Sequence, residues 1–216
     1  MEKGGFLYAS LAADAAVPEM TSLFGARIVD RAISSEVTIK MTEAFGGLKP
    51  GDTFHYSVPS ASIQSWGALL EVSSGKVIAV DQNGNPALVI NSIGAGKTLL
   101  CAYPIEHYLA NVPAAFDHPD NTPKLYEAFR EWTGVKPAFR SDHAEVEVSS
   151  LKGEGRGYLV VVNHSDQAQD ASILTTLPVR SYAVIGPEGS KPLASEGTNA
   201  KVHLGAYEAV VLEWKQ

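Results

Sequence analysis

Residues 84–106, GNPALVINSIGAGKTLLCAYPIE, place two apolar runs of strand length on either side of a glycine-rich link. Gly94 and Gly96 allow this link to reverse the chain within a few residues. Two similar apolar runs, separated by short polar links, precede the stretch. The four runs are Trp66–Val72, Lys76–Val80, Ala87–Asn91 and Lys97–Tyr103. Their spacing predicts an antiparallel meander over residues 65–103.

The same link resembles the end of a nucleotide-binding loop, because residues 94–98 have the sequence GAGKT. That loop requires a glycine five residues before Gly96, where Asn91 stands, and a helix after Thr98. The apolar residues after Thr98 predict a strand instead, so we interpret the link as a hairpin turn. No cofactor is predicted for this segment or for any other.

Strand and helix patterns both occur around the meander. Phe6–Ser10 is a short apolar run, Val37–Met41 alternates apolar and polar residues, and Gly25 is a suitable end for a short helix. A longer helix is predicted between Thr122 and Gly134, where apolar residues recur at i, i+4 and i+7. We therefore predict an α/β domain over residues 1–138.

Residues 139–216 lack helical periodicity. Six short apolar runs are separated there by clusters of Gly, Pro, Asn and Ser, a spacing typical of small β-sandwiches. We predict a C-terminal β-sandwich domain over residues 139–216, with the boundary near Phe139. The six runs are Val146–Ser149, Gly157–Asn163, Ala171–Thr175, Ser181–Ile185, Lys201–Leu204 and Tyr207–Trp214.

The composition excludes several classes of protein. The chain has 216 residues, of which 45% are hydrophobic, and is long enough to bury a core. Its formal net charge of -7 and its lack of basic runs argue against nucleic acid as a partner. No run of about 18 apolar residues predicts a membrane span. The segment before Phe6 has no signal-peptide pattern, which leaves the compartment open and slightly favours the cytoplasm.

Three residues near the end of the meander are candidates for chemistry. Glu106 follows an apolar strand, and strand ends often face ligand clefts, so Glu106 and its neighbour His107 are substrate-cleft candidates. A paired structural carboxylate is the competing interpretation of Glu106. Cys101, the single cysteine, is the one thiol nucleophile available, but its apolar neighbours favour a core-filling side chain. No residue is assigned as catalytic, and no metal site is predicted.

The three tryptophans carry two interpretations. Trp66, Trp132 and Trp214 all lie in apolar runs or stripes, which favours packing in the core or at an interface. Tryptophan also stacks on sugars when it is exposed in a groove. The sequence favours the first interpretation for all three.

Several of these segments resemble one family. Residues 4–8, GGFLY, followed by residues 17–27, VPEMTSLFGAR, are similar to a strand-to-helix segment of β-galactosidase-type glycoside hydrolases. That segment lies in the non-catalytic, glutamine-amidotransferase-like domain after the barrel. Further similar segments are residues 84–89, 94–97 and 102–106 in the same domain, and residues 158–163 and 204–212 in the β-sandwiches that end many glycosidases.

The resemblance implies an incomplete class I glutamine-amidotransferase-like (flavodoxin-like) domain followed by a small antiparallel β-sandwich. It implies no amidotransferase chemistry, because residues 103–106, YPIE, stand where a His-Pro-Glu-like partner is expected and no earlier cysteine exists. The opening strands of that domain have no counterpart before Phe6. We therefore expect a C-terminal fragment of a longer protein, with an exposed sheet edge around Phe6–Ser10 that favours homo-oligomers.

The functional hypothesis is a non-catalytic C-terminal portion of a glycoside hydrolase that acts on β-linked sugars. The catalytic carboxylates would lie in an upstream barrel, against which this chain would pack, shape the sugar cleft or mediate oligomer contacts. Carbohydrate is then a partner through the parent enzyme. One alternative is an amidase or esterase that uses Cys101, Glu106 and His107. The other is a carbohydrate-binding module that uses exposed aromatic residues, for which the candidates are Tyr158, Tyr182, Tyr207 and Trp214.

Overall fold

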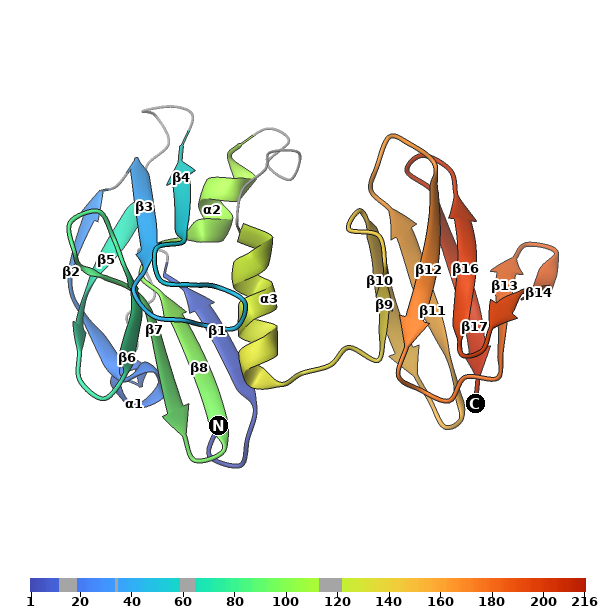
Figure 1. The fold of residues 1–216 in the computed structure, drawn as a ribbon, viewed down its shortest axis with the longest axis horizontal. Helices are drawn as coiled ribbons and strands as arrows, with labels where there is room; N and C mark the ends of the chain where they lie inside the picture. Colours follow the sequence, from blue (N-terminus) through green and yellow to red (C-terminus); the bar gives the residue numbers. More distant parts are fainter. Residues whose placement is uncertain (12–18, 34, 59–64, 113–121) are drawn as a thin grey trace. The chain divides into compact units, whose positions relative to one another are not determined.

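The computed structural model describes residues 1–11, 19–33, 35–58, 65–112 and 122–216 (Figure 1). The chain divides into two compact units, residues 1–135 and residues 136–216. Each unit has its own cluster of buried apolar side chains. Whether the units are independent domains with a boundary near Phe139 stays a prediction.

The first unit contains eight strands and three helices in its described residues. They are β1 (Phe6–Ser10), α1 (Met20–Phe24), β2 (Ala26–Ile33), β3 (Glu36–Met41), β4 (Thr53–Ser57), β5 (Trp66–Val72), β6 (Lys76–Val80), β7 (Pro86–Ile93), β8 (Gly96–Cys101), α2 (Ile105–Ala110) and α3 (Thr122–Thr133).

Six of these strands form one sheet in the order β1-β8-β7-β6-β3-β4. The predicted meander is confirmed for β6, β7 and β8, which pair in antiparallel succession, and Ile93 pairs with Gly96 across the predicted hairpin turn. It is wrong for β5. That strand pairs with β2 in a separate two-stranded ribbon rather than with β6.

The α/β, flavodoxin-like fold class predicted for this unit is wrong. A flavodoxin-like domain has a mostly parallel sheet with helices on both faces. Here every pair in the six-stranded sheet is antiparallel except β1 with β8. The links explain the difference, because a parallel pair requires a crossover of about a dozen residues or more, whereas short turns follow β6 and β7. The described chain, with seventeen strands and three helices, is mainly β.

The predicted long helix is confirmed as α3, and its apolar stripe contacts the core. Leu125 is fully buried, while Phe129 and Trp132 pack partly buried against the core cluster. At the end of the helix, Lys97 Nζ donates a 2.6 Å hydrogen bond to the Trp132 carbonyl oxygen and lies 5.0 Å from the centre of the Trp132 ring. The lysine of the GAGKT sequence therefore holds the C-terminus of a helix, where a cation is favoured.

Two glycines allow α1 to approach the β5–β6 turn. Gly25 ends the helix at a φ of +65°, and a Cβ atom on it would lie 2.1 Å from the backbone nitrogen of Gly75. A side chain at either position would separate the two segments. The short helix predicted to end at Gly25 is thus confirmed as Met20–Phe24, while Pro18, which suits a first helical position, lies outside the described residues.

The second unit consists of two antiparallel sheets. Their orders are β10-β11-β17-β13-β14 and β15-β16-β12-β9, and buried side chains from both contribute to one cluster that includes Trp214 and Phe139, whose rings lie 5.2 Å apart. All six predicted strands are present. The strands are β9 (Phe139–Ser141), β10 (Val146–Lys152), β11 (Arg156–Asn163), β12 (Gln169–Thr175), β13 (Ser181–Gly186), β14 (Gly189–Leu193), β15 (Ser195–Glu196), β16 (Asn199–Leu204) and β17 (Ala209–Lys215).

Candidate functional site

The parallel pairing of β1 with β8 brings distant residues to the same edge of the sheet. Ser10, the last residue of β1, pairs with Cys101, the last residue of β8. The chain then turns through Pro104 into α2, so Glu106 in the first turn of that helix lies beside Ser10. The structure thus places Glu106 in the first turn of α2, beside the last residue of β1, and its role at a substrate cleft stays a prediction.

Two hydroxyl groups bind the Glu106 carboxylate. Ser10 Oγ donates a hydrogen bond to Oε2, and Tyr126 on α3 donates a 2.7 Å hydrogen bond to Oε1. Partial burial disfavours the charged form, but these hydrogen bonds outweigh it and hold the pKa of Glu106 below its ordinary value. Glu106 is therefore ionised at neutral pH.

Tyr8, two residues before Ser10 on β1, is the fourth member of this cluster. Its ring meets that of Tyr126 edge to face, with centroids 5.8 Å apart. The Tyr8 hydroxyl is buried close to the Glu106 carboxylate and the Tyr126 hydroxyl. Burial, together with the nearby Cys101 and Glu106, raises the pKa of Tyr8, so the phenol stays neutral.

Cys101 and His107 differ sharply in their environments. Cys101 is completely buried at the end of β8, and burial raises the pKa of its thiol to about 12. A nucleophilic cysteine requires the opposite conditions, which are exposure and a lowered pKa. His107 follows Glu106 on α2 with an exposed side chain, and its backbone carbonyl accepts a 2.8 Å hydrogen bond from Asn111.

Within this cluster, the Glu106 carboxylate is a hydrogen-bond acceptor. An acid catalyst in a glycosidase needs a raised pKa so that it carries a proton, whereas the pKa of Glu106 is lowered. Its hydrogen-bond partners in the described part of the chain are hydroxyl groups. Glu106 can therefore orient a loop or accept a hydrogen bond, but it lacks the environment of a general acid.

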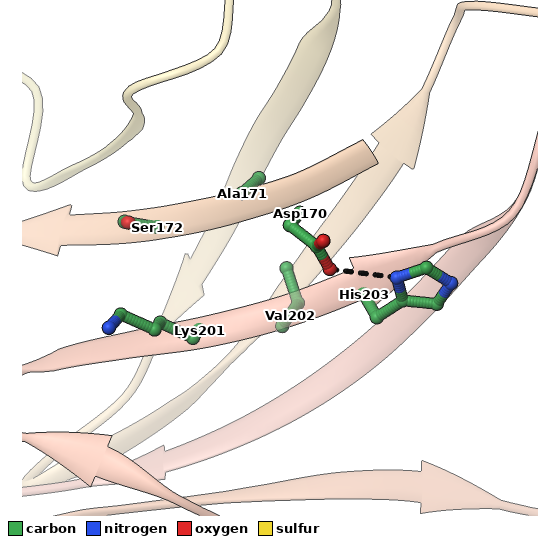
Figure 2. A pocket seen from close by; sticks show the side chains of 6 residues that line it. All are labelled: Asp170, Ala171, Ser172, Lys201, Val202 and His203. Carbon is green, nitrogen blue, oxygen red and sulfur yellow. Dashed lines mark hydrogen bonds and ion pairs between the residues drawn. The ribbon is translucent and has the colours of Figure 1, made fainter. Parts of the chain in front are cut away.

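A hollow lies on the outer face of the four-stranded sheet. It has a volume of about 490 Å³ and is lined by residues 170–172 and 201–203. Figure 2 shows Asp170 and His203 facing each other across β12 and β16, with Asp170 Oδ1 2.8 Å from His203 Nδ1. Both side chains are mostly exposed, at 88% and 69%, so the pair is a solvated cross-strand contact of small energetic weight.

The aromatic residues proposed for a carbohydrate-binding module do not share one exposed face. Trp214 is completely buried, and Tyr182 is buried with its hydroxyl donating a 2.7 Å hydrogen bond to the Thr198 carbonyl oxygen. Tyr158 and Tyr207 are exposed at 43% and 71%, but Tyr158 lies in β11, whereas Tyr207 lies in the turn before β17. The coplanar platform that this alternative requires is not formed by these four side chains.

The described ranges contain no group of three or more His, Cys, Asp or Glu residues suited to a metal ion. Neither do they contain a helix whose length and hydropathy would let it cross a membrane.

The chain is similar to known proteins in structure but not in sequence. No protein-family model and no curated protein matches the chain. Among solved structures, the β-galactosidase from Bacillus circulans sp. alkalophilus matches over 98% of this chain with a TM-score of 0.64 at 17% identity. The cold-adapted β-galactosidase from Rahnella sp. R3 matches over the whole chain with a TM-score of 0.64 at 14% identity. This chain has the fold of a part of the β-galactosidases.

The β-galactosidase-like fold extends through both units, because the matches cover nearly all of the chain. The chain spans only 29% of the length of each of these two enzymes. An α-L-fucosidase isoenzyme from Paenibacillus thiaminolyticus is also similar, with a TM-score of 0.61, 12% identity and coverage of 98% of this chain and 36% of that one. The resemblance to β-galactosidase-type enzymes predicted from sequence is therefore confirmed at the level of fold.

The sequence analysis missed three members of the Glu106 cluster: Ser10, Tyr8 and Tyr126. The available signal was the strand character of Phe6–Ser10, because a strand parallel to the one before Glu106 would end at the same edge. Nothing in the local sequence identifies that pairing.

Proposed function

We propose that the chain is a non-catalytic portion of a glycoside hydrolase that acts on β-linked sugars. Its role is to pack against the catalytic barrel, to shape the wall of the sugar cleft or to hold subunits together. The observation that carries the proposal is the likeness in fold to β-galactosidases, which spans both units but only 29% of each enzyme. Because most of each enzyme lies outside the matched part, the active site is expected there.

The state of Glu106 argues against its acting as the acid catalyst of a glycosidase. Glycoside hydrolysis requires a protonated carboxylic acid and a second carboxylate held across the scissile bond. Glu106 has a lowered pKa and is bound by two hydroxyl groups. It suits a positioning role at a cleft better than proton transfer.

Exposed apolar surface supports a packing role. The outer face of the five-stranded sheet carries a row of apolar side chains, because Leu151 pairs with Tyr158, and Val160 and Ile185 both pair with Val211. All five are between 37% and 69% exposed. Contiguous apolar patches of this kind mark interaction surfaces. We assign the remainder of the parent enzyme as the occupant, since the similar β-galactosidases are more than three times as long as the matched part.

The sheet edge at β1 supports subunit contacts. Among the described residues, β1 ends the six-stranded sheet and pairs with β8 alone, and Phe6 on it is 43% exposed. An edge strand with open backbone groups pairs readily with another chain.

Turnover by the purified chain tests the proposal directly. We expect no hydrolysis of 4-nitrophenyl β-D-galactoside, β-D-glucoside or β-D-mannoside. Hydrolysis that the substitution Glu106→Gln abolishes would contradict the proposal.

Reading the gene upstream of Met1 provides a second test. An in-frame coding region of barrel length would support the proposal, whereas a ribosome-binding site placed at Met1 would oppose it.

In a full-length parent, Glu106→Gln separates a positioning role from a catalytic one. A positioning carboxylate predicts a modest change in KM or stability with kcat largely kept. A fall in kcat of about 10⁴-fold or more would assign Glu106 to the chemical step.

A further inference from the structure

The β2–β5 ribbon carries a hollow separate from the Glu106 cluster. It has a volume of about 450 Å³ and is lined by Ile28, Val29, Asp30, Arg31 and Trp66. Figure 1 places β2 and β5 on the side of the first unit away from α3. The hollow therefore lies apart from Tyr126 and the carboxylate that it binds.

A β-bulge at Val29 arranges the residues around this hollow. Ile28 pairs with Leu70 and Asp30 with Leu69, so Val29 is the extra residue on β2. Bulges re-aim the side chains that follow them and are frequent beside binding sites.

The pairing after the bulge places a cation beside an aromatic ring. Arg31 pairs with Ala68, and Ile33 pairs with Trp66. Because side chains two positions apart share a face, Arg31 and Trp66 project from the same face at diagonal positions, within reach of one ligand.

Trp66 behaves as a surface residue rather than as part of the core. Its side chain is 37% exposed, and it is absent from the set of apolar side chains that pack against the core of the described unit. Val29 and Ile33 beside it are 50% and 57% exposed. An exposed indole ring next to apolar neighbours offers a flat surface for stacking.

Arg31 and Asp30 supply polar groups to the same hollow. Arg31 Nε is buried and has no hydrogen-bond partner within the described residues, which is costly unless a ligand or water binds it. Asp30 Oδ1 accepts a 2.8 Å hydrogen bond from the Arg31 backbone nitrogen, which fixes the position of a carboxylate that also lines the hollow. The hollow thus has one donor group and one acceptor group among its lining residues, in addition to the indole ring.

We propose that this hollow binds a pyranose sugar ring. The apolar face of the sugar would stack on Trp66, and its hydroxyl groups would accept from Arg31 and donate to Asp30. The charges favour a neutral ligand, because Asp30 repels the carboxylates or phosphates that Arg31 alone would attract. The choice of a sugar among flat polar rings rests on the function proposed above.

Titration of the chain with methyl β-D-galactopyranoside tests this site. We expect backbone amide NMR shifts that concentrate at residues 28–31 and 66–68 and that saturate with sugar concentration. Trp66→Ala should weaken binding by about tenfold or more. Arg31→Gln should weaken it as well, and Trp66→Phe, which keeps a ring, should weaken it less than Trp66→Ala.

A matched control separates this site from any other exposed aromatic residue. Tyr158→Ala removes a ring of similar exposure from a strand of the other unit and should leave the affinity unchanged. Unchanged amide spectra outside the hollow confirm that each variant is folded. Absence of saturable shifts, shifts elsewhere, or equal affinity of wild type and Trp66→Ala would overturn the inference. None of these results alters the proposed function, which turnover and gene context test separately.

Discussion

The Tyr103 phenol donates a 2.7 Å hydrogen bond to Asp81 Oδ2 and so ties the end of β8 to the turn between β6 and β7. Asp81 is only 4% exposed and also accepts hydrogen bonds from the backbone nitrogens of Asn83 and Asn85, at 2.8 Å each. The Asn85 side chain adds a fourth hydrogen bond, at 3.0 Å. One buried carboxylate therefore organises a turn and anchors the strand that leads to Glu106.

Removal of this carboxylate should destabilise the first unit. Asp81→Ala leaves the Tyr103 hydroxyl and two backbone N–H groups without their acceptor, so we expect the free energy of unfolding to fall by about 2–4 kcal/mol. Urea denaturation measures the change. Asp166→Ala, at an exposed aspartate, is the control and should change stability by less than about 0.5 kcal/mol. Equal effects of the two substitutions would contradict this account of Asp81.

Stability should decrease in acid. Burial raises the pKa of Asp81, but the hydrogen bonds from Tyr103, Asn85 and Asn83 outweigh it, so the folded-state pKa is below the ordinary value. A carboxylate with a depressed pKa contributes stability above its unfolded pKa, and that contribution is lost as pH falls through the folded pKa. Glu106 shifts in the same direction. We expect the free energy of unfolding to fall below about pH 4 and the fall to be shallower in Asp81→Asn. An unchanged profile in that variant would show that Asp81 does not contribute to it.

Cys101 should be inert in the folded chain. Its thiol is buried and its pKa is raised to about 12, so almost no thiolate is present at neutral pH. We expect slow labelling by iodoacetamide, measured by mass spectrometry, and fast labelling after addition of denaturant. Rapid labelling of the native chain would favour the amidase or esterase alternative instead.

A charge on the edge strand should reduce self-association. Phe6→Lys places a cation on β1, a device by which natural edge strands avoid pairing. We expect the purified chain to associate with increasing concentration in sedimentation velocity and the variant to remain closer to a monomer. Ala168→Lys, which changes an exposed residue of the other unit outside the apolar row, controls for the added charge. A wild-type chain that stays monomeric at high concentration would count against a subunit contact at β1.

Local patterns in the sequence predicted local structure well. The stripe of Leu125, Phe129 and Trp132 identified α3, and the turn residues of the second unit separated six of its nine strands. The short strands β9, β14 and β15 were not predicted. The failure concerned pairing. β5 has the same apolar character as its neighbours, and nothing within Trp66–Val72 indicates that its partner is β2 rather than β6.

The same limit applies to the sites. Glu106 was identified because its own context, the end of an apolar strand, is local. Ser10 and Tyr126 join it through a parallel strand pair and a helix contact that only the folded chain defines. Trp66 was interpreted as a packing residue because its own run is apolar. The hollow beside it depends on the bulge at Val29, which belongs to the other strand of the ribbon and leaves no trace in the Trp66 run.

The attachment of β1 to β8 delays part of folding during synthesis. Ser10 binds a carboxylate that lies 96 positions further along the chain, and β8 is the only strand that pairs with β1 among the described residues. At a translation rate of about 5–20 residues per second, the partner emerges from the ribosome roughly 5–20 s after β1. The apolar segment Phe6–Ser10 therefore stays unpaired on the nascent chain during that time. In this state it is accessible to chaperones and proteases.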